Sequence, residues 1–242
     1  MTNIAGQTLA SIVSNNHFTV AVLEKYHLDF CCKGKRTLAE ACKEKGLSIE
    51  TISSELRQTT AKEEQTRMPF TEMNAEQLIS YILIHHHFYV KQSMPAIIGH
   101  LEKVVQKHAE RYPYMVKVLE LFREINTEMT AHMNKEEVIL FPRIKEVEAQ
   151  FNAKQNSCLP GDYISNPIEV MEKEHEHAGD ILYEIRALTN TYTPPVDACT
   201  TFKVCFAELK EFEEDLHRHV HLENNLLFPM AEKMLILQTC LN

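Results

Sequence analysis

The sequence predicts an all-α protein in which a small N-terminal helical domain precedes an up-down bundle of four long helices. The chain of 242 residues has only six glycines and no tryptophan, and it is rich in the helix formers Leu, Glu, Lys and Met. Four long segments with helical periodicity follow several short ones. One eleven-residue frame occurs twice, in the second and fourth long segments. We expect the small domain at residues 1–60, a linker at 61–73 and the bundle at 74–242.

The small domain is predicted to contain four short helices. They cover residues 8–13, 18–26, 37–45 and 49–56. Gly46 is placed to end the third helix, and Ser48 is placed to cap the fourth. A tight turn at residues 30–34 carries two adjacent thiols, Cys31 and Cys32. The following stretch is polar, of mixed charge, and contains Pro69, which is typical of a linker.

The four bundle helices are predicted from their caps and prolines. Asn74, with Gln77 three residues later, opens the first helix, which runs to about Glu110. Pro113 opens the second, which Pro142 bends or ends. Asn166 caps the third, which runs to about Thr189, and residues 152–165 form the loop before it. The fourth opens at residues 193–195 and carries the second copy of the frame to Phe228. Met234–Leu237 forms an apolar tail that we expect to pack on the bundle.

The repeated frame places His, Glu, Leu, Phe and Pro at identical offsets. The copies begin at His132 and at His219, and the glutamates four residues later are Glu136 and Glu223. Residues four apart share one face of a helix. Two such helices facing each other would direct two imidazoles and two carboxylates to one centre. This set suits iron, zinc or manganese.

A solvated surface pair is the alternative for either copy alone. Apolar side chains share the face of each copy, and ionisable groups on such a face are costly unless they are paired or bind metal. The recurrence of the whole frame also favours a metal site. A rival Glu-x-x-His pattern, found in ferritin-like bundles, occurs at Glu174 and at Glu214. The second of these lies on a wetter face, so the repeated frame is preferred.

Further ligands should come from the first and third bundle helices. On the third, His175 shares its face with apolar residues and His177 does not, so His175 is expected to point inward. On the first, periodicity does not choose among His85, His86 and His87. His87 lies 88 residues before His175, close to the 87-residue offset of the repeat. If the helix pairs are duplicated, His87 is the counterpart of His175.

Composition excludes several classes of function. A net charge of −9 argues against a broad nucleic-acid or anionic-membrane surface, and no apolar run is long enough to span a bilayer. The N-terminus lacks the features of a signal peptide. The seven cysteines are irregularly spaced, so a reducing cytoplasm is expected. The cysteines outside the tight turn are expected to be buried small hydrophobic residues. They are Cys42, Cys158, Cys199, Cys205 and Cys240.

These motifs together resemble a known family. Residues 74–232 resemble a hemerythrin-like di-iron bundle. Residues 27–42, with the double-cysteine turn, resemble the small domain that precedes this bundle in the repair-of-iron-centres family of iron–sulfur cluster repair proteins. Lys33 departs from the family pattern, where glycine is usual. Its positive charge is expected to favour the thiolate form of the neighbouring cysteines.

The resemblance implies a non-haem centre of two iron ions with oxo and carboxylate bridges. Its metal ligands fall on six residues: His87, His132, Glu136, His175, His219 and Glu223. Glu128 and Glu174 match acidic residues near the family's site and would orient ligands or line a route for iron and protons. Glu137, paired with Asn224 in the repeat, is left outside the ligand set. Cys31 and Cys32 would handle iron or NO, or exchange electrons.

The implied function is repair of iron–sulfur clusters damaged by oxidative or nitrosative stress, with the di-iron centre as the iron source. Its partners would be damaged iron–sulfur proteins or a cluster-assembly scaffold, with NO or O₂ as small ligands. One alternative is an enzyme that reduces NO. Another is an O₂- or NO-binding sensor or carrier, and a third is a zinc or purely structural bundle. The sequence leaves the oligomeric state open, with a homodimer as one option.

Overall fold

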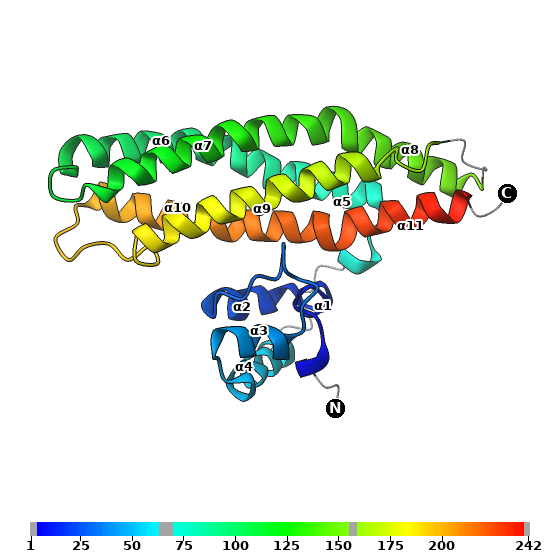
Figure 1. The fold of residues 1–242 in the computed structure, drawn as a ribbon, viewed down its shortest axis with the longest axis horizontal. Helices are drawn as coiled ribbons and strands as arrows, with labels where there is room; N and C mark the ends of the chain where they lie inside the picture. Colours follow the sequence, from blue (N-terminus) through cyan, green and yellow to red (C-terminus); the bar gives the residue numbers. More distant parts are fainter. Residues whose placement is uncertain (1–3, 63–69, 155–158, 240–242) are drawn as a thin grey trace.

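The computed structural model describes residues 4–62, 70–154 and 159–239, and within these ranges the chain forms helices and no strands. One isolated antiparallel bridge joins Thr8 and Thr37. Figure 1 shows four long helical rods side by side, with a group of short helices against one side of them. The predicted all-α class is confirmed.

The small domain contains four helices. They are α1 (Leu9–Asn15), α2 (Val20–Lys25), α3 (Leu38–Lys45) and α4 (Ile49–Lys62), with 3₁₀ turns η1 (Ile4–Gly6) and η2 (His17–Thr19). Gly46 ends α3 in the left-handed conformation with φ 63°. The Ser48 hydroxyl accepts the Thr51 N–H at 3.3 Å, so both predicted caps are present. α4 extends past its expected end at Leu56, because no glycine or proline interrupts the helix there. Residues 63–69 of the expected linker lie outside the described residues.

Each of the four rods corresponds to one predicted bundle helix. The first contains α5 (Ala75–Tyr81), η4 (Ile82–His87) and α6 (Phe88–His108), after the 3₁₀ turn η3 (Phe70–Glu72). The second contains α7 (Tyr114–Lys135), η5 (Glu136–Leu140) and α8 (Phe141–Asn152). The third is α9 (Ser165–Leu188). The fourth contains α10 (Thr200–Leu222), η6 (Glu223–Leu227) and α11 (Phe228–Thr239).

Two of the four predicted rod starts are wrong. The third rod begins at Ser165 rather than after Asn166, because the turn at 162–165 already has helical geometry and the Asn166 N–H bonds the Asp162 carbonyl. The fourth begins at Thr200 rather than at 193–195. There the chain first makes a turn in which the Ala198 N–H bonds the Pro195 carbonyl at 2.9 Å.

Three rods contain a π-helical segment, η4, η5 and η6. In a π-helix the N–H bonds the carbonyl five residues back. The Phe141 N–H therefore bonds the Glu136 carbonyl, and the Phe228 N–H bonds the Glu223 carbonyl. Pro142, which has no N–H, directly follows this wider turn and does not end the second rod. Such segments are frequent at functional sites, and η5 and η6 each begin at the repeated glutamate.

Two apolar clusters fill the interior. One combines the small domain with the inner faces of α6, α7, α9 and α10, so the small domain shares a core with the bundle. The other joins α5, α8 and α11 to the start of α9. In the predicted tail, Met234 and Leu235 are buried and Ile236 and Leu237 are exposed. None of the helices in the described ranges has the length and apolarity needed to cross a bilayer.

The scattered cysteines only partly match the expectation. Cys42 and Cys205 are buried, as predicted. Cys199 is exposed, with its Sγ 3.4 Å from Nε2 of His108, because it lies at the start of α10 rather than on an inward face. Cys158 and Cys240 lie outside the described residues.

Candidate metal centre

The six predicted ligands come together inside the bundle. Each is at most 1% exposed. They are His87 at the end of η4, His132 on α7, Glu136 at the start of η5, His175 on α9, His219 on α10 and Glu223 at the start of η6. Their nitrogen and oxygen atoms form two groups, each with all its ligand atoms within 4.8 Å of one another. Glu136 and Glu223 belong to both groups.

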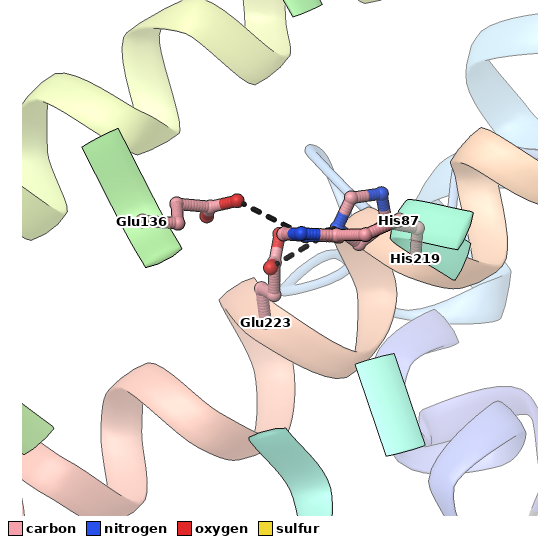
Figure 2. Close-up of side chains that lie close together, drawn as sticks. All are labelled: His87, Glu136, His219 and Glu223. Atoms are coloured by element: carbon pink, nitrogen blue, oxygen red, sulfur yellow. Dashed lines mark hydrogen bonds and ion pairs between the residues drawn. The ribbon is translucent and has the colours of Figure 1, made fainter. Parts of the chain in front are cut away.

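The first group adds His87 and His219 to the shared glutamates. Nε2 of His87 lies 3.3 Å from Glu136 Oε2, and Nε2 of His219 lies 3.1 Å from Glu223 Oε1. The two Nε2 atoms are 3.2 Å apart. Figure 2 shows both carboxylates directed toward the two imidazoles. We call this group subsite 1.

The second group adds His132 and His175. Nε2 of His132 lies 3.4 Å from Glu136 Oε2, and Nε2 of His175 lies 3.2 Å from Glu223 Oε2. The two Nε2 atoms are 3.0 Å apart. We call this group subsite 2. Each subsite thus presents two imidazole nitrogens and two carboxylates, and the carboxylates are common to both.

The donor set fits a pair of cations. Within the described residues, both oxygens of Glu136 and Oε2 of Glu223 are buried without a hydrogen-bond partner. Buried carboxylates in that condition are costly unless a cation neutralises them. Paired imidazole and carboxylate donors suit divalent iron, manganese or zinc. Four imidazoles and two shared carboxylates match the requirement of two metal ions with two carboxylate bridges.

Charge pairing in the cluster shifts the pKa values of its members. Burial alone would lower the pKa of His132, but the neighbouring Glu136 and Glu174 carboxylates outweigh it and raise that pKa to about 10. Burial would raise the pKa of Glu223, but His219 and His175 hold it well below its usual range. The carboxylates are therefore ionised, and a proton on His132 competes with a metal ion for the same nitrogen.

Three side chains contact the outer nitrogen of a predicted ligand. Nδ1 of His132 lies 2.9 Å from Glu174 Oε2, which is the contact of a residue that orients a ligand. Nδ1 of His175 lies 2.9 Å from Asn224 Oδ1. Glu137 was expected to lie outside the ligand set, and no role was predicted for Asn224. Both directly follow a repeated glutamate, and this shared position was the signal for a shared role.

Glu137 makes the third contact, with its Oε1 2.8 Å from Nδ1 of His87. The Lys91 ammonium group donates to the same oxygen at 2.6 Å. Glu174 is likewise joined to Lys135. Both carboxylates are partly exposed, so each connects a buried imidazole to the surface of the bundle.

The structure places Glu128 elsewhere. Its Oε1 lies 3.2 Å from Nε2 of His177, and the side chains of His177 and Glu128 are 52% and 39% exposed. With Glu124 they form a surface group separate from the buried six. His177 is solvated, as expected. In the rival pattern, Glu214 pairs with Lys210 at 3.3 Å.

Of the other histidines in η4, His85 is exposed and His86 is 5% exposed. The His86 ring stacks on His219, with ring centres 5.5 Å apart and planes 7° apart. Its Nδ1 lies 3.0 Å from Asp215 Oδ1. His86 therefore lies directly behind a predicted ligand, and periodicity alone did not distinguish this position from that of His87.

The double-cysteine turn contacts the fourth rod. It is the loop between α2 and α3, and Figure 1 shows it reaching α10. Asn225 Nδ2 donates to the Cys31 carbonyl at 3.1 Å, and Asn225 belongs to η6, which begins at Glu223. The thiols lie 3.9 Å apart, and Asp29 accepts three backbone N–H groups of the turn.

The expectation of a thiolate is wrong for Cys31. Its contact with Cys32, burial and the carboxylate of Asp29 raise its pKa well above the usual value. The positive charge of Lys33 does not offset these effects, because Lys33 is exposed to solvent.

Comparison with known proteins agrees with this architecture. Residues 78–231 match the hemerythrin HHE cation binding domain, and residues 5–60 match the ScdA_N domain, a domain of unknown function (DUF542). The iron–sulfur cluster repair protein YtfE of Citrobacter koseri is 36% identical over 211 residues, which cover 87% of this chain and 90% of the relative. The proteins of the same name from Escherichia coli and Shigella boydii are 35% identical with the same coverage.

The chain belongs to the YtfE family. Its hemerythrin domain contains the buried histidine–glutamate groups, and its ScdA_N domain contains the double-cysteine turn.

Proposed function

We propose that this member of the YtfE family holds two non-haem iron ions at the six buried residues and supplies iron for the repair of damaged iron–sulfur clusters. One observation carries the proposal: subsites 1 and 2 use different histidines but share Glu136 and Glu223. A shared pair of carboxylates keeps two cations side by side. When bound, the ions would supply electron-transfer chemistry and sites for small ligands such as NO or O₂.

The relatives support the repair part of the proposal. The three YtfE proteins compared above are named for cluster repair. Clusters damaged by oxidative or nitrosative stress lose iron, and a protein that receives iron again needs a donor that releases it. Damaged iron–sulfur proteins or a cluster-assembly scaffold would be the recipients. The oxo bridge implied by the resemblance would complete the centre.

Cys31 and Cys32 are proposed to act in this function through their thiols. Their Sγ atoms are 3.9 Å apart. A disulfide between adjacent cysteines is strained and easily reduced, so the pair suits a transient redox role rather than a permanent cross-link. The raised pKa of Cys31 favours a protonated thiol at rest. A reducing compartment such as the cytoplasm would keep this pair reduced.

Domain limits follow the same proposal: the double-cysteine domain at residues 1–60, a linker at 61–73, and the metal-binding bundle at 74–242. The matched ranges 5–60 and 78–231 lie within these limits. Glu174, through its contact with His132, is proposed to orient that ligand.

The test is elemental analysis of the purified protein with an absorption spectrum of the same sample. We expect about two irons per chain and near-ultraviolet oxo-to-iron bands. The iron-loaded protein should then restore activity to an enzyme whose cluster was damaged with NO, and the apoprotein should not. Zinc, or no metal after anaerobic addition of ferrous iron, would contradict the proposal.

Consumption of NO by the iron-loaded protein, without iron transfer to the damaged enzyme, would instead support the alternative of an NO-reducing enzyme. Cys31→Ser/Cys32→Ser protein should keep its iron and lose repair activity. Unchanged repair by this variant would contradict the proposed role of the thiols.

A further inference from the structure

We propose that the two subsites are unequal, and that subsite 1, formed with His87 and His219, releases its iron first. This inference rests on the proposed di-iron function and adds which ion is donated. It follows from the contacts that surround the four imidazoles. These contacts differ between the subsites, although the shared carboxylates are the same.

Both imidazoles of subsite 2 have a hydrogen-bonding partner at Nδ1, the nitrogen that is not directed at the shared carboxylates. Nδ1 of His132 is 2.9 Å from the Glu174 carboxylate, and Nδ1 of His175 is 2.9 Å from the Asn224 amide oxygen. Each contact selects the tautomer whose Nε2 is free for a metal ion, and each fixes the plane of the ring. Glu174, a carboxylate, also makes its imidazole a stronger donor.

Only one imidazole of subsite 1 is held in this way. Nδ1 of His87 is 2.8 Å from Glu137. Nδ1 of His219 is fully buried and has no hydrogen-bond partner among residues 4–62, 70–154 and 159–239. No contact at Nδ1 in that part of the chain therefore favours the tautomer of His219 whose Nε2 is free for a metal ion, or strengthens this imidazole as a donor. Loss of one such outer contact typically weakens metal binding ~10- to 100-fold.

The sequence explains the difference. Glu174 directly precedes His175 and reaches across to His132. The residue that directly precedes His87 is His86, which in the same way lies against His219. In place of a carboxylate, however, this position has an imidazole whose Nδ1 is paired with Asp215. His86 therefore stacks on the ring of His219 and offers no hydrogen-bond acceptor to Nδ1 of His219.

Subsite 1 also lies beside a cavity. A cavity of about 290 Å³ lies between the small domain and the bundle, and both His86 and Asp215 line it. The His86 ring, which lines this space, stacks on the ring of His219. The less supported imidazole is thus next to a space in which an acceptor of iron, or a small chelator, could approach.

The test measures iron release from the full-length protein loaded anaerobically with two ferrous ions. Excess ferrozine is added, and the absorbance of its ferrous complex gives the number of irons released in each kinetic phase. We expect two phases of one iron each, with the fast phase ~10-fold or more faster than the slow one.

Three variants assign the phases to the subsites. His86→Glu supplies His219 with the carboxylate that Glu174 gives to His132, so it should slow the fast phase toward the slow one. His85→Glu makes the same change of charge at the neighbouring exposed position and should leave both phases unchanged. Glu174→Ala removes a contact of subsite 2 and should accelerate the slow phase only. Imidazole ¹⁵N NMR of the apoprotein should show Nδ1–H of His219 becoming hydrogen-bonded in His86→Glu.

A single rate for both irons in the wild-type protein would overturn the inference while leaving the di-iron function intact. Acceleration of the fast phase by Glu174→Ala would also overturn it, even if His86→Glu failed to fold. If His86→Glu and His85→Glu changed the rates of iron release equally, the added negative charge alone would explain the effect. The inference would then again be overturned. Binding of fewer than two irons would contradict the proposed function itself.

Discussion

The side-chain nitrogen of Asn225 donates a hydrogen bond to the backbone carbonyl of Cys31 at 3.1 Å. Asn225 lies two residues after Glu223 in η6, and it also reaches the carbonyl of Phe30 at 3.4 Å. The His221 ring supports the same turn, with Nδ1 3.4 Å from the Phe30 carbonyl. The double-cysteine turn is thus fixed to the segment that begins at a predicted bridging glutamate.

Asn225→Ala should loosen this turn. Each lost hydrogen bond contributes about 0.5–1.5 kcal/mol, and Cys31, now only 5% exposed, should react faster with an aromatic disulfide reagent. The rate is measured in a Cys199→Ser background, because Cys199 is exposed and would react first. Asn152→Ala, an exposed change far along the second rod, is the control. Equal thiol rates in both variants would show that Asn225 does not hold the turn.

Gly34→Ala should destabilise the small domain. A Cβ at this position would lie 2.2 Å from the Phe30 carbonyl oxygen and 2.9 Å from the Cβ of Ala10, and relief of such overlap costs about 1–3 kcal/mol. Gly99→Ala, inside α6 with no atom within 4 Å of the new Cβ, should instead stabilise the protein by about 0.5–1 kcal/mol. Denaturant unfolding of both variants measures whether each change lowers or raises the free energy of unfolding. A Gly34→Ala protein as stable as wild type would contradict the tight turn.

Removal of iron should lower the melting temperature. Iron binds the folded state only, and at a free concentration a thousand times Kd this adds about 4 kcal/mol. Glu136→Gln should lose most of the difference between loaded and apo melting temperatures, because Glu136 belongs to both subsites. Glu128→Gln, at the surface, should keep the difference. Scanning calorimetry of all three proteins with and without iron measures it.

The pairing of Glu174 with His132 should stabilise the apoprotein most in mildly acidic solution. The contact with His132 lowers the pKa of Glu174 from 4.5 to about 2, so its contribution is present above pH 4.5 and is lost as the pH falls toward 2. The pKa of His132 is raised from 6.5 to about 10, so its contribution is present below pH 6.5 and is lost as the pH rises toward 10. Both act fully between pH 4.5 and 6.5.

Glu174→Gln should remove the acidic part of this dependence, measured as the urea midpoint of the apoprotein against pH. Glu169→Gln is the control, since the exposed carboxylate of Glu169 pairs with the exposed ammonium group of Lys173 on the same helix. If wild type and Glu174→Gln lost stability identically between pH 5 and 2, the pairing of Glu174 with His132 would not contribute.

Local chemistry made parts of the fold predictable. The capping box of Asn74 and Gln77 depends on side chains three residues apart, and the His-x-x-x-Glu frame keeps its ligands on one face in any helix. The starts of the third and fourth rods were missed because Pro167 and Pro194 suit both a first helical turn and the loop before it. The backbone conformation of the turns around these prolines determines where each helix begins.

The contacts behind the ligands were less predictable. In a regular α-helix, the residue after a ligand points about 100° away from it, so helical periodicity does not predict Glu137 and Asn224 as partners of other imidazoles. The wider π-turns that begin at Glu136 and Glu223 are not visible in a hydrophobic pattern. Burial of the Cys31 thiol depends on the docking of two domains, and charge on neighbouring residues does not predict it.

The π-turns also determine which way the side chains that follow them in each rod point. Each is equivalent to one residue inserted into an α-helix, which rotates everything beyond it by about 100°. Deletion of one residue from η5 would restore a regular helix and turn Phe141 and Ile144, now buried, out of the second apolar cluster. The extra residue of η5 therefore determines which side chains of α8 face the second apolar cluster, and the second rod keeps that packing only while the π-turn is kept.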